Sequence, residues 1–168
     1  MPVVFRSRVF SVETLDVTTR GHVHEVAIVR HRPCVVLLPF DDDGRVVLVR
    51  QFRPALGRHL WELPAGGIDP DEDPDVAAAR ECEEEIGRVP HRLDRLAALY
   101  PTPGYCDELM VFYRASDLRV PAADSPHRPD DDEDITTQAF TIEEARAMVA
   151  RGEIVDLKSA YGLTLASR

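Results

Sequence analysis

The 168-residue sequence lacks several features that define large functional classes. Its three cysteines lie far apart and form no C-x-x-C pair, so neither a zinc site nor a redox motif is expected. Apolar runs such as 35–38 and 46–49 are far shorter than the roughly 20 residues that a membrane span needs. Arg6 and Arg8 interrupt what would be the apolar core of a signal peptide. We therefore expect a cytoplasmic protein with reduced thiols and no membrane partner.

Positive charge is also scarce, because 20 Lys and Arg residues stand against 30 Asp and Glu, for a formal net charge of −10. No sequence-wide basic field exists to bind a phosphate backbone, and nucleic acid is not expected as a partner. Hydrophobic residues make up 44% of the chain. At this length they suffice for one buried core, so we expect a single domain.

Strand and turn signals alternate along most of the chain. They predict N-terminal strands between residues 3 and 30, a hairpin of strands 33–40 and 45–52, a short strand at 61–63, and strands at 95–100, 108–114 and 135–140. Residues 115–134 are rich in Pro and Asp and predict a long loop. Thr141, with Glu144 three residues later, and Asp156 predict the starts of two C-terminal helices. The predicted fold class is α/β, with helices covering a strand-rich body.

The clearest local signal is a helix from Pro74 to Ile86. Asp73 is a typical N-cap residue, Pro74 suits the first helical position, and Gly87 favours a left-handed stop. Four apolar residues recur at helical spacing and are expected to form the buried stripe: Val76, Ala79, Cys82 and Ile86.

Glu81, Glu84 and Glu85 are i, i+3 and i+4 neighbours on another face of this helix. Like charges at these spacings repel by about 0.2–0.5 kcal/mol per pair. A divalent cation would remove this penalty, and an all-carboxylate set suits Mg²⁺ or Mn²⁺ rather than zinc. The alternative is a solvated acidic helix face with no ligand.

The residues around this helix favour the metal. Gly66, Glu72, Arg80-Glu81, Glu84-Glu85 and Gly87 match the seven fixed letters of G-x5-E-x7-R-E-U-x-E-E-x-G-U, and the segment thereby resembles the signature of the Nudix hydrolase family. The resemblance implies an α/β/α sandwich with a mixed β-sheet and N-terminal antiparallel strands. It also implies roles for particular residues. Glu81, Glu85 and the carbonyl of Ala65 would hold Mg²⁺, Glu84 would bind the metal directly or through water, and Arg80 would pair with Glu72 and orient Glu84.

Three further stretches resemble the ADP-ribose pyrophosphatase branch of that family. Residues 50–54 (RQFRP) and 61–66 (WELPAG) resemble two of its motifs, which implies that Arg53 contacts substrate. Residues 102–108 (TPGYCDE) resemble its S/T-P-G-x-x-D-E loop, which implies substrate contacts for Gly104 and Glu108. The acidic run 130–134 resembles a loop that brings a late carboxylate to the site. Glu133 is the predicted general base, with Asp132 and Asp134 as the alternatives.

The resemblance implies Mg²⁺-dependent hydrolysis of a pyrophosphate bond, with ADP-ribose cleaved to AMP and ribose 5-phosphate as the expected reaction. Nucleotide sugars and dinucleotides such as NADH, FAD or a diadenosine polyphosphate are the alternative substrates. A nucleotide-sensing module without catalysis is disfavoured because every motif carboxylate is present. Kinship further implies a homodimer, in which residues 1–32 form strands at the interface and residues 33–168 form the catalytic core.

Overall fold

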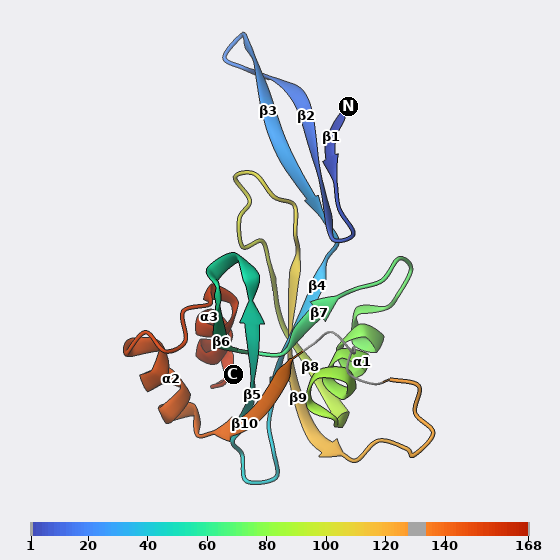
Figure 1. The fold of residues 1–168 in the computed structure, drawn as a ribbon, viewed down its shortest axis with the longest axis vertical. Coiled ribbons are helices and arrows are strands. Elements are labelled where there is room, and N and C mark those ends of the chain that lie inside the picture. Colours follow the sequence, from blue (N-terminus) through green and yellow to red (C-terminus); the bar gives the residue numbers. More distant parts are fainter. Residues whose placement is uncertain (1, 128–133, 168) are drawn as a thin grey trace.

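The computed structural model describes residues 2–127 and 134–167 (Figure 1). The strands within these residues are β1 (Val3–Arg6), β2 (Phe10–Thr19), β3 (His22–His31), β4 (Cys34–Pro39), β5 (Val46–Arg53), β6 (Arg58–Glu62), β7 (Ala65–Gly67), β8 (Val89–Leu99), β9 (Met110–Arg119) and β10 (Ile135–Phe140). The helices are α1 (Pro74–Ile86), α2 (Ile142–Ala150) and α3 (Leu157–Leu165), with a short 3-10 turn at Pro54–Leu56.

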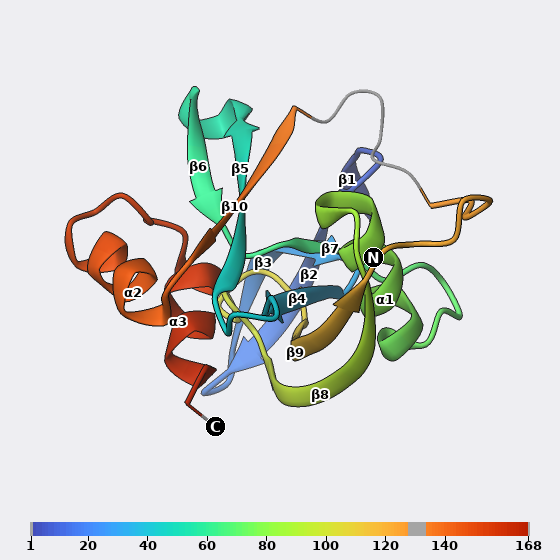
Figure 2. The same cartoon turned by 90° about the horizontal axis from the view of Figure 1, so that it is seen from below.

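These strands form three sheets. A four-stranded mixed sheet of order β7-β4-β9-β8 has β4 and β9 parallel, and β10-β5-β6 form an antiparallel sheet beside it. Helix α1 lies on one side of these sheets and α2 and α3 on the other (Figures 1 and 2). The antiparallel sheet β1-β2-β3 extends away from this body (Figure 1). The predicted fold class is confirmed.

The expected hairpin of strands 33–40 and 45–52 is wrong in its pairing. The turn itself forms, since Gly44 N donates to Asp41 O at 2.9 Å, but only one bridge, between Phe40 and Val46, joins the two strands. Strand β4 is buried along its whole length and its two edges are taken by β7 and β9. No edge is left for β5, which therefore continues into the other sheet with β6 and β10.

Helix α1 begins and ends where the sequence predicts, with Asp73 accepting from Asp75 N and Gly87 in the left-handed conformation. Its buried face matches the predicted stripe only in part. Cys82 is buried and Ile86 packs against the same core, as predicted. Val76, by contrast, is 59% exposed, and Ala77 and Ala78 pack against β4 in its place. The small side chains allow α1 to lie close to the sheet. With this face buried, the acidic residues of α1 point toward the sheet edge.

The second part of the core lies on the opposite side of β4, against α2 and α3. Both helices have the predicted caps, with Thr141 Oγ1 accepting from Glu144 N at 3.1 Å and Asp156 accepting from Ser159 N at 3.1 Å. Strand β9 runs to Arg119, five residues beyond its predicted end, so the loop after it begins later than expected. No helix in residues 2–127 and 134–167 is long and apolar enough to cross a membrane.

Candidate active site

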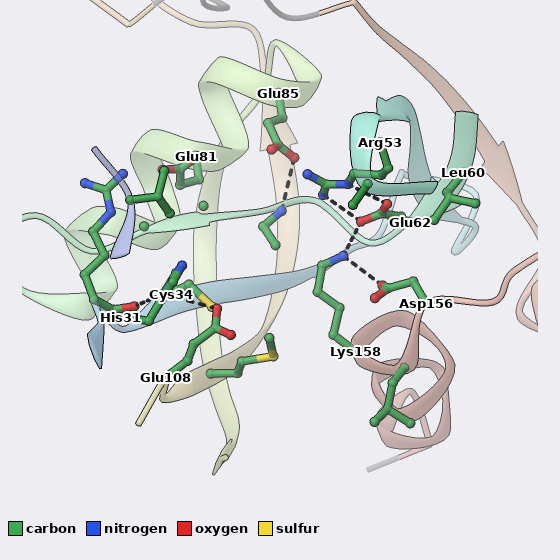
Figure 3. Close-up of a pocket in the computed structure, with 18 of the residues that line it drawn as sticks. His31, Cys34, Arg53, Leu60, Glu62, Glu81, Glu85, Glu108, Asp156 and Lys158 are labelled. Atoms are coloured by element: carbon green, nitrogen blue, oxygen red, sulfur yellow. Dashed lines mark hydrogen bonds and ion pairs between the residues drawn. The ribbon is translucent and has the colours of Figure 1, made fainter. Parts of the chain in front are cut away.

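A cleft of about 890 Å³ lies where α1, β7, the facing ends of β5 and β6, and the start of α3 meet (Figure 3). Helix α1 contributes carboxylates to its wall, and β5 and α3 contribute cationic side chains. The base of the N-terminal sheet closes another side with Arg8, His31 and Arg32. Of the predicted site residues, the cleft wall includes Arg53, Ala65, Arg80, Glu81, Glu84, Glu85 and Glu108.

Arg80 organises the acidic face of α1. Its Nη1 donates to Glu81 at 2.6 Å and to Glu84 at 2.9 Å, while Nε and Nη2 hold both oxygens of Glu72 at 2.9 Å. The hydrogen bonds to Glu72 are the largest of several effects that raise the pKa of Arg80, and the same bonds lower the pKa of Glu72. The predicted pairing of Arg80 with Glu72 and Glu84 is thus present, and the guanidinium remains charged at every physiological pH.

The residues before α1 fit closely against its carboxylates. A Cβ atom on Gly66 would lie about 2.0 Å from the carboxylate carbon of Glu81, so only glycine leaves the Glu81 side chain its present place. The backbone N–H of Ala65 donates to Glu85 Oε2 at 3.1 Å. Strand β7 is therefore held directly against the acidic face of α1, through the contact of Gly66 with Glu81 and the hydrogen bond of Ala65 to Glu85.

The three motif carboxylates converge on one cleft but are not clustered tightly. Among residues 2–127 and 134–167, no three His, Cys, Asp or Glu side chains are close enough to hold a metal ion. Glu81 and Glu84 both point to the Arg80 guanidinium, and Glu84 also lies 3.6 Å from Nδ1 of His127. Glu85 faces Ala65 instead (Figure 3).

A second charged group faces α1 across the cleft, and Arg53 is its one member that the sequence predicted. Glu62 is only 2% exposed, and both its oxygens accept from Arg53, at 2.8 and 2.7 Å. Lys158 at the start of α3 also donates to Glu62, and to Asp156 at 2.7 Å (Figure 3). Burial alone would raise the pKa of Glu62, but Arg53 and Lys158 outweigh it and the net direction is downward. Glu62 is therefore an anion inside the cleft wall.

One signal in the sequence could have indicated this group. Lys158 is the only lysine among the 20 Lys and Arg residues of the chain. Its partner Glu62 stands between Trp61 and Leu63 in a largely apolar strand end, where an unpaired carboxylate would be costly. Neither feature by itself predicts that Lys158 and Glu62 are partners, because 96 positions separate the two residues in the sequence.

The loop before β9 reaches the cleft at one residue only. Glu108 lies on the wall, with Oε1 3.6 Å from His31 Nδ1 and 3.5 Å from Cys34 Sγ. Burial raises the pKa of the Cys34 thiol, which makes it a poor nucleophile. Gly104 is in the same loop but not on the cleft wall, so its substrate contact stays a prediction. Glu133 lies outside the described residues.

Comparisons with known proteins agree with this geometry. Residues 30–158 match the family model described as the NUDIX domain. The chain is 33% identical to an ADP-ribose pyrophosphatase of Bacillus subtilis over 161 residues, which cover 95% of this chain and 86% of the relative. It is 38% identical to an ADP-ribose pyrophosphatase of Mycobacterium tuberculosis over 137 residues, covering 81% and 65% of the two chains. A solved ADP compounds hydrolase superposes with a TM-score of 0.78 at 25% identity, covering 99% of this chain and 89% of that one.

Proposed function

The chain belongs to the NUDIX domain family, and from this premise we propose that it hydrolyses the pyrophosphate bond of ADP-ribose, releasing AMP and ribose 5-phosphate. The observation that carries the proposal is the cleft itself, in which the three motif glutamates of α1 face Arg53 across a space of about 890 Å³. This arrangement offers carboxylates for a metal on one wall and a cation for a diphosphate on the other. The two ADP-ribose pyrophosphatases similar to this chain support the choice of substrate.

The donors of the acidic wall fit a divalent metal ion. Glu81, Glu84 and Glu85 provide only hard oxygen atoms, the ligands that Mg²⁺ and Mn²⁺ prefer, and Gly66 leaves the Glu81 carboxylate room beside the strand. Glu81, Glu85 and the carbonyl of Ala65 would hold the ion, with Glu84 as a further ligand or a holder of water. An ion bound there supplies positive charge against the diphosphate oxygens, which otherwise repel a nucleophile.

The remaining residues bind and orient. Arg53 contacts the diphosphate with a side chain that is 40% exposed and held by Glu62. Arg80, fixed by Glu72, keeps Glu81 and Glu84 in place at the cleft wall. Glu108, on the cleft wall beside His31, binds the substrate, and Gly104 in the same loop is the further substrate contact that the resemblance implies.

We assign the general base to Glu133, which would take the proton of the attacking water. Supporting this choice, strand β10 begins at Ile135 opposite Gln51, two residues before Arg53 on β5. The chain thus enters β10 beside the strand that leads to the cleft. A Glu133→Gln variant should lose turnover while binding substrate with unchanged affinity, and retention of full turnover would remove Glu133 from this role.

We further propose a cytoplasmic homodimer formed through the N-terminal sheet. This sheet stands apart from the body (Figure 1), and its apolar residues are exposed: Val3, Val4, Phe5, Phe10 and Val23. Exposed apolar area of this kind is typical of an interface. Analytical ultracentrifugation of the full chain and of a Phe5→Asp variant tests the proposal, which predicts a dimer for the first and dissociation for the second.

The first experiment follows AMP and ribose 5-phosphate release from ADP-ribose with and without Mg²⁺. Two variants of α1 form a matched pair: Glu85→Gln removes a carboxylate from the cleft wall, whereas Glu83→Gln removes one that lies outside it. We expect Mg²⁺-dependent release by the wild type and by Glu83→Gln, and its loss in Glu85→Gln. Cleavage of a nucleotide sugar, NADH, FAD or a diadenosine polyphosphate in preference to ADP-ribose would keep the chemistry and reject the substrate.

A further inference from the structure

The wall opposite the acidic helix carries a partly buried network of four charges from three parts of the chain. Arg53 ends β5, Glu62 ends β6, and Asp156 and Lys158 stand at the start of α3 (Figure 3). The side chain of Lys158 is 9% exposed and that of Glu62 is 3% exposed, whereas that of Arg53 is 40% exposed. Of the two cations, only Arg53 therefore offers substantial surface to a ligand in the cleft, and Lys158 contacts Glu62 beneath that surface.

The charge count explains why a second cation is needed. Glu62 alone would neutralise Arg53, since it accepts from both Nε and Nη2 of the guanidinium. Lys158 provides a second positive charge to the same carboxylate. Asp156 adds a second negative charge, since its carboxylate accepts from Lys158 at 2.7 Å as well as from Ser159 N at 3.1 Å and Ser159 Oγ at 2.5 Å. Arg53 and Lys158 together balance the two carboxylates, so that without Lys158 the group would carry a net negative charge toward an anionic ligand.

The position of Lys158 is fixed by its neighbour. Ser159 is fully buried, and its hydroxyl oxygen accepts from Leu63 N at 2.7 Å, one residue after Glu62. The start of α3 is therefore tied to the end of β6 on both sides of the ion pair. An ammonium held in this way defines the orientation of Glu62, and Glu62 in turn defines that of the Arg53 guanidinium.

We propose that Lys158, anchored by Asp156, is a positioning residue for substrate recognition, which acts through Glu62 to keep Arg53 oriented toward the diphosphate of the substrate and balances the negative charge around it. This inference rests on the proposed function for the identity of the substrate. It assigns the C-terminal helix α3 a part in substrate binding, beyond its part in the core. Lys158 is the one lysine of the chain, beside 19 arginines. Its compact ammonium fits between two carboxylates, where its side chain is 9% exposed.

The test is a double-mutant cycle between Lys158→Met and Arg53→Met, read on the kinetics of ADP-ribose hydrolysis. We expect Lys158→Met to raise KM about tenfold and to change kcat less than about twofold, because binding and not chemistry is affected. On the Arg53→Met background the same substitution should raise KM no further, since its effect passes through Arg53. Lys158→Arg, which keeps the charge, should recover part of the lost affinity. Equal increases in KM on both backgrounds, or an unchanged KM in Lys158→Met, would overturn the proposal.

A control separates positioning from loss of stability. Arg146 on α2 donates to the Leu163 carbonyl at 3.0 Å and so fixes α3 at its far end, away from the cleft wall. Arg146→Met should lower the unfolding temperature without raising KM. If both Arg146→Met and Lys158→Met lower the unfolding temperature and raise KM to the same extent, Lys158 has a structural role only.

The same double-mutant cycle is repeated with the dissociation constant of inorganic pyrophosphate, measured by calorimetry. This measurement requires no turnover. If the wild type fails to hydrolyse ADP-ribose but the two substitutions remain non-additive for pyrophosphate, the proposed substrate is wrong and the role of Lys158 stands. If hydrolysis is present and the substitutions are additive in both readouts, the proposed function stands and the role of Lys158 is rejected.

Discussion

Replacing Gly66 with alanine should separate activity from stability. The three atoms nearest to a Cβ at this position all belong to the Glu81 carboxylate, at 2.0–2.1 Å, so that carboxylate must move. Gly66 is not in the left-handed conformation, and alanine can adopt its backbone without strain. The substitution therefore acts on one side chain of the cleft wall and leaves strand β7 in place.

The cost in stability should be small. A glycine-to-alanine change in a strand gains about 0.5–1 kcal/mol of backbone entropy. Against this, Glu81 loses its 2.6 Å hydrogen bond to Arg80, and a hydrogen bond to a charged group contributes about 1.5–3 kcal/mol. Arg80 keeps Glu72 and Glu84 as partners, so the net loss should be about 1–2 kcal/mol, or a fall of about 2–8 °C in the unfolding temperature.

The cost in activity should be much larger. Displacement of a group that holds the metal or its shell typically reduces activity about 10- to 100-fold, and we expect this loss in kcat/KM for Mg²⁺-dependent ADP-ribose hydrolysis. Gly67→Ala is the matched comparison, because its Cβ would meet the guanidinium of Arg32, which is 48% exposed and can swing away. Its loss should be clearly smaller.

Activity of Gly66→Ala within about twofold of the wild type, or a loss equal to that of Gly67→Ala, would contradict a displaced Glu81. So would a further loss of activity when Gly66→Ala is added to a Glu81→Ala background. In that double variant the displaced carboxylate is already absent, so the clash with its atoms no longer exists.

Three further expectations follow from the charged groups and the cap of α1. Arg80→Lys should lower kcat/KM about 10- to 100-fold with the circular dichroism spectrum unchanged, because one ammonium cannot hold Glu72 at two points and reach the other glutamates; full activity would contradict this. Burial raises the pKa of Glu62, but its cationic partners outweigh burial and leave the pKa below its ordinary value of 4.5. The ionised Glu62 therefore stabilises the folded state fully above pH 4.5, and this contribution is lost as the pH falls through the lower pKa of the folded state. Glu62→Gln should therefore flatten the decline in unfolding free energy below pH 4.5 in urea titrations, and equal slopes would count against the assignment. Asp73→Ala should cost about 1 kcal/mol in the same titrations at neutral pH, since Asp73 accepts from Asp75 N at 2.8 Å, whereas an unchanged midpoint would show that the cap contributes nothing.

The sequence by itself determined the features that depend on near neighbours in the chain. Helix α1 has the predicted limits because its cap, its first-turn proline and its terminal glycine are all local signals. The pairing of Arg80 with Glu84 follows from one helical turn, and the fixed spacing of the family signature places Gly66 against Glu81. Of the seven predicted site residues that line the cleft, the four on α1 owe their common position to this helix.

Tertiary structure alone decided the features that require distant partners. The edges of β4 are filled by β7 and β9, so the strand that follows β4 in the chain pairs elsewhere, against the local hairpin signal. The orientation of α1 buries Ala77 and Ala78 and exposes Val76, because close packing against the sheet outweighs the size of a single apolar side chain. Lys158 and Glu62 meet only after α3 packs beside β6, since an ion pair across 96 residues leaves no periodicity in the sequence.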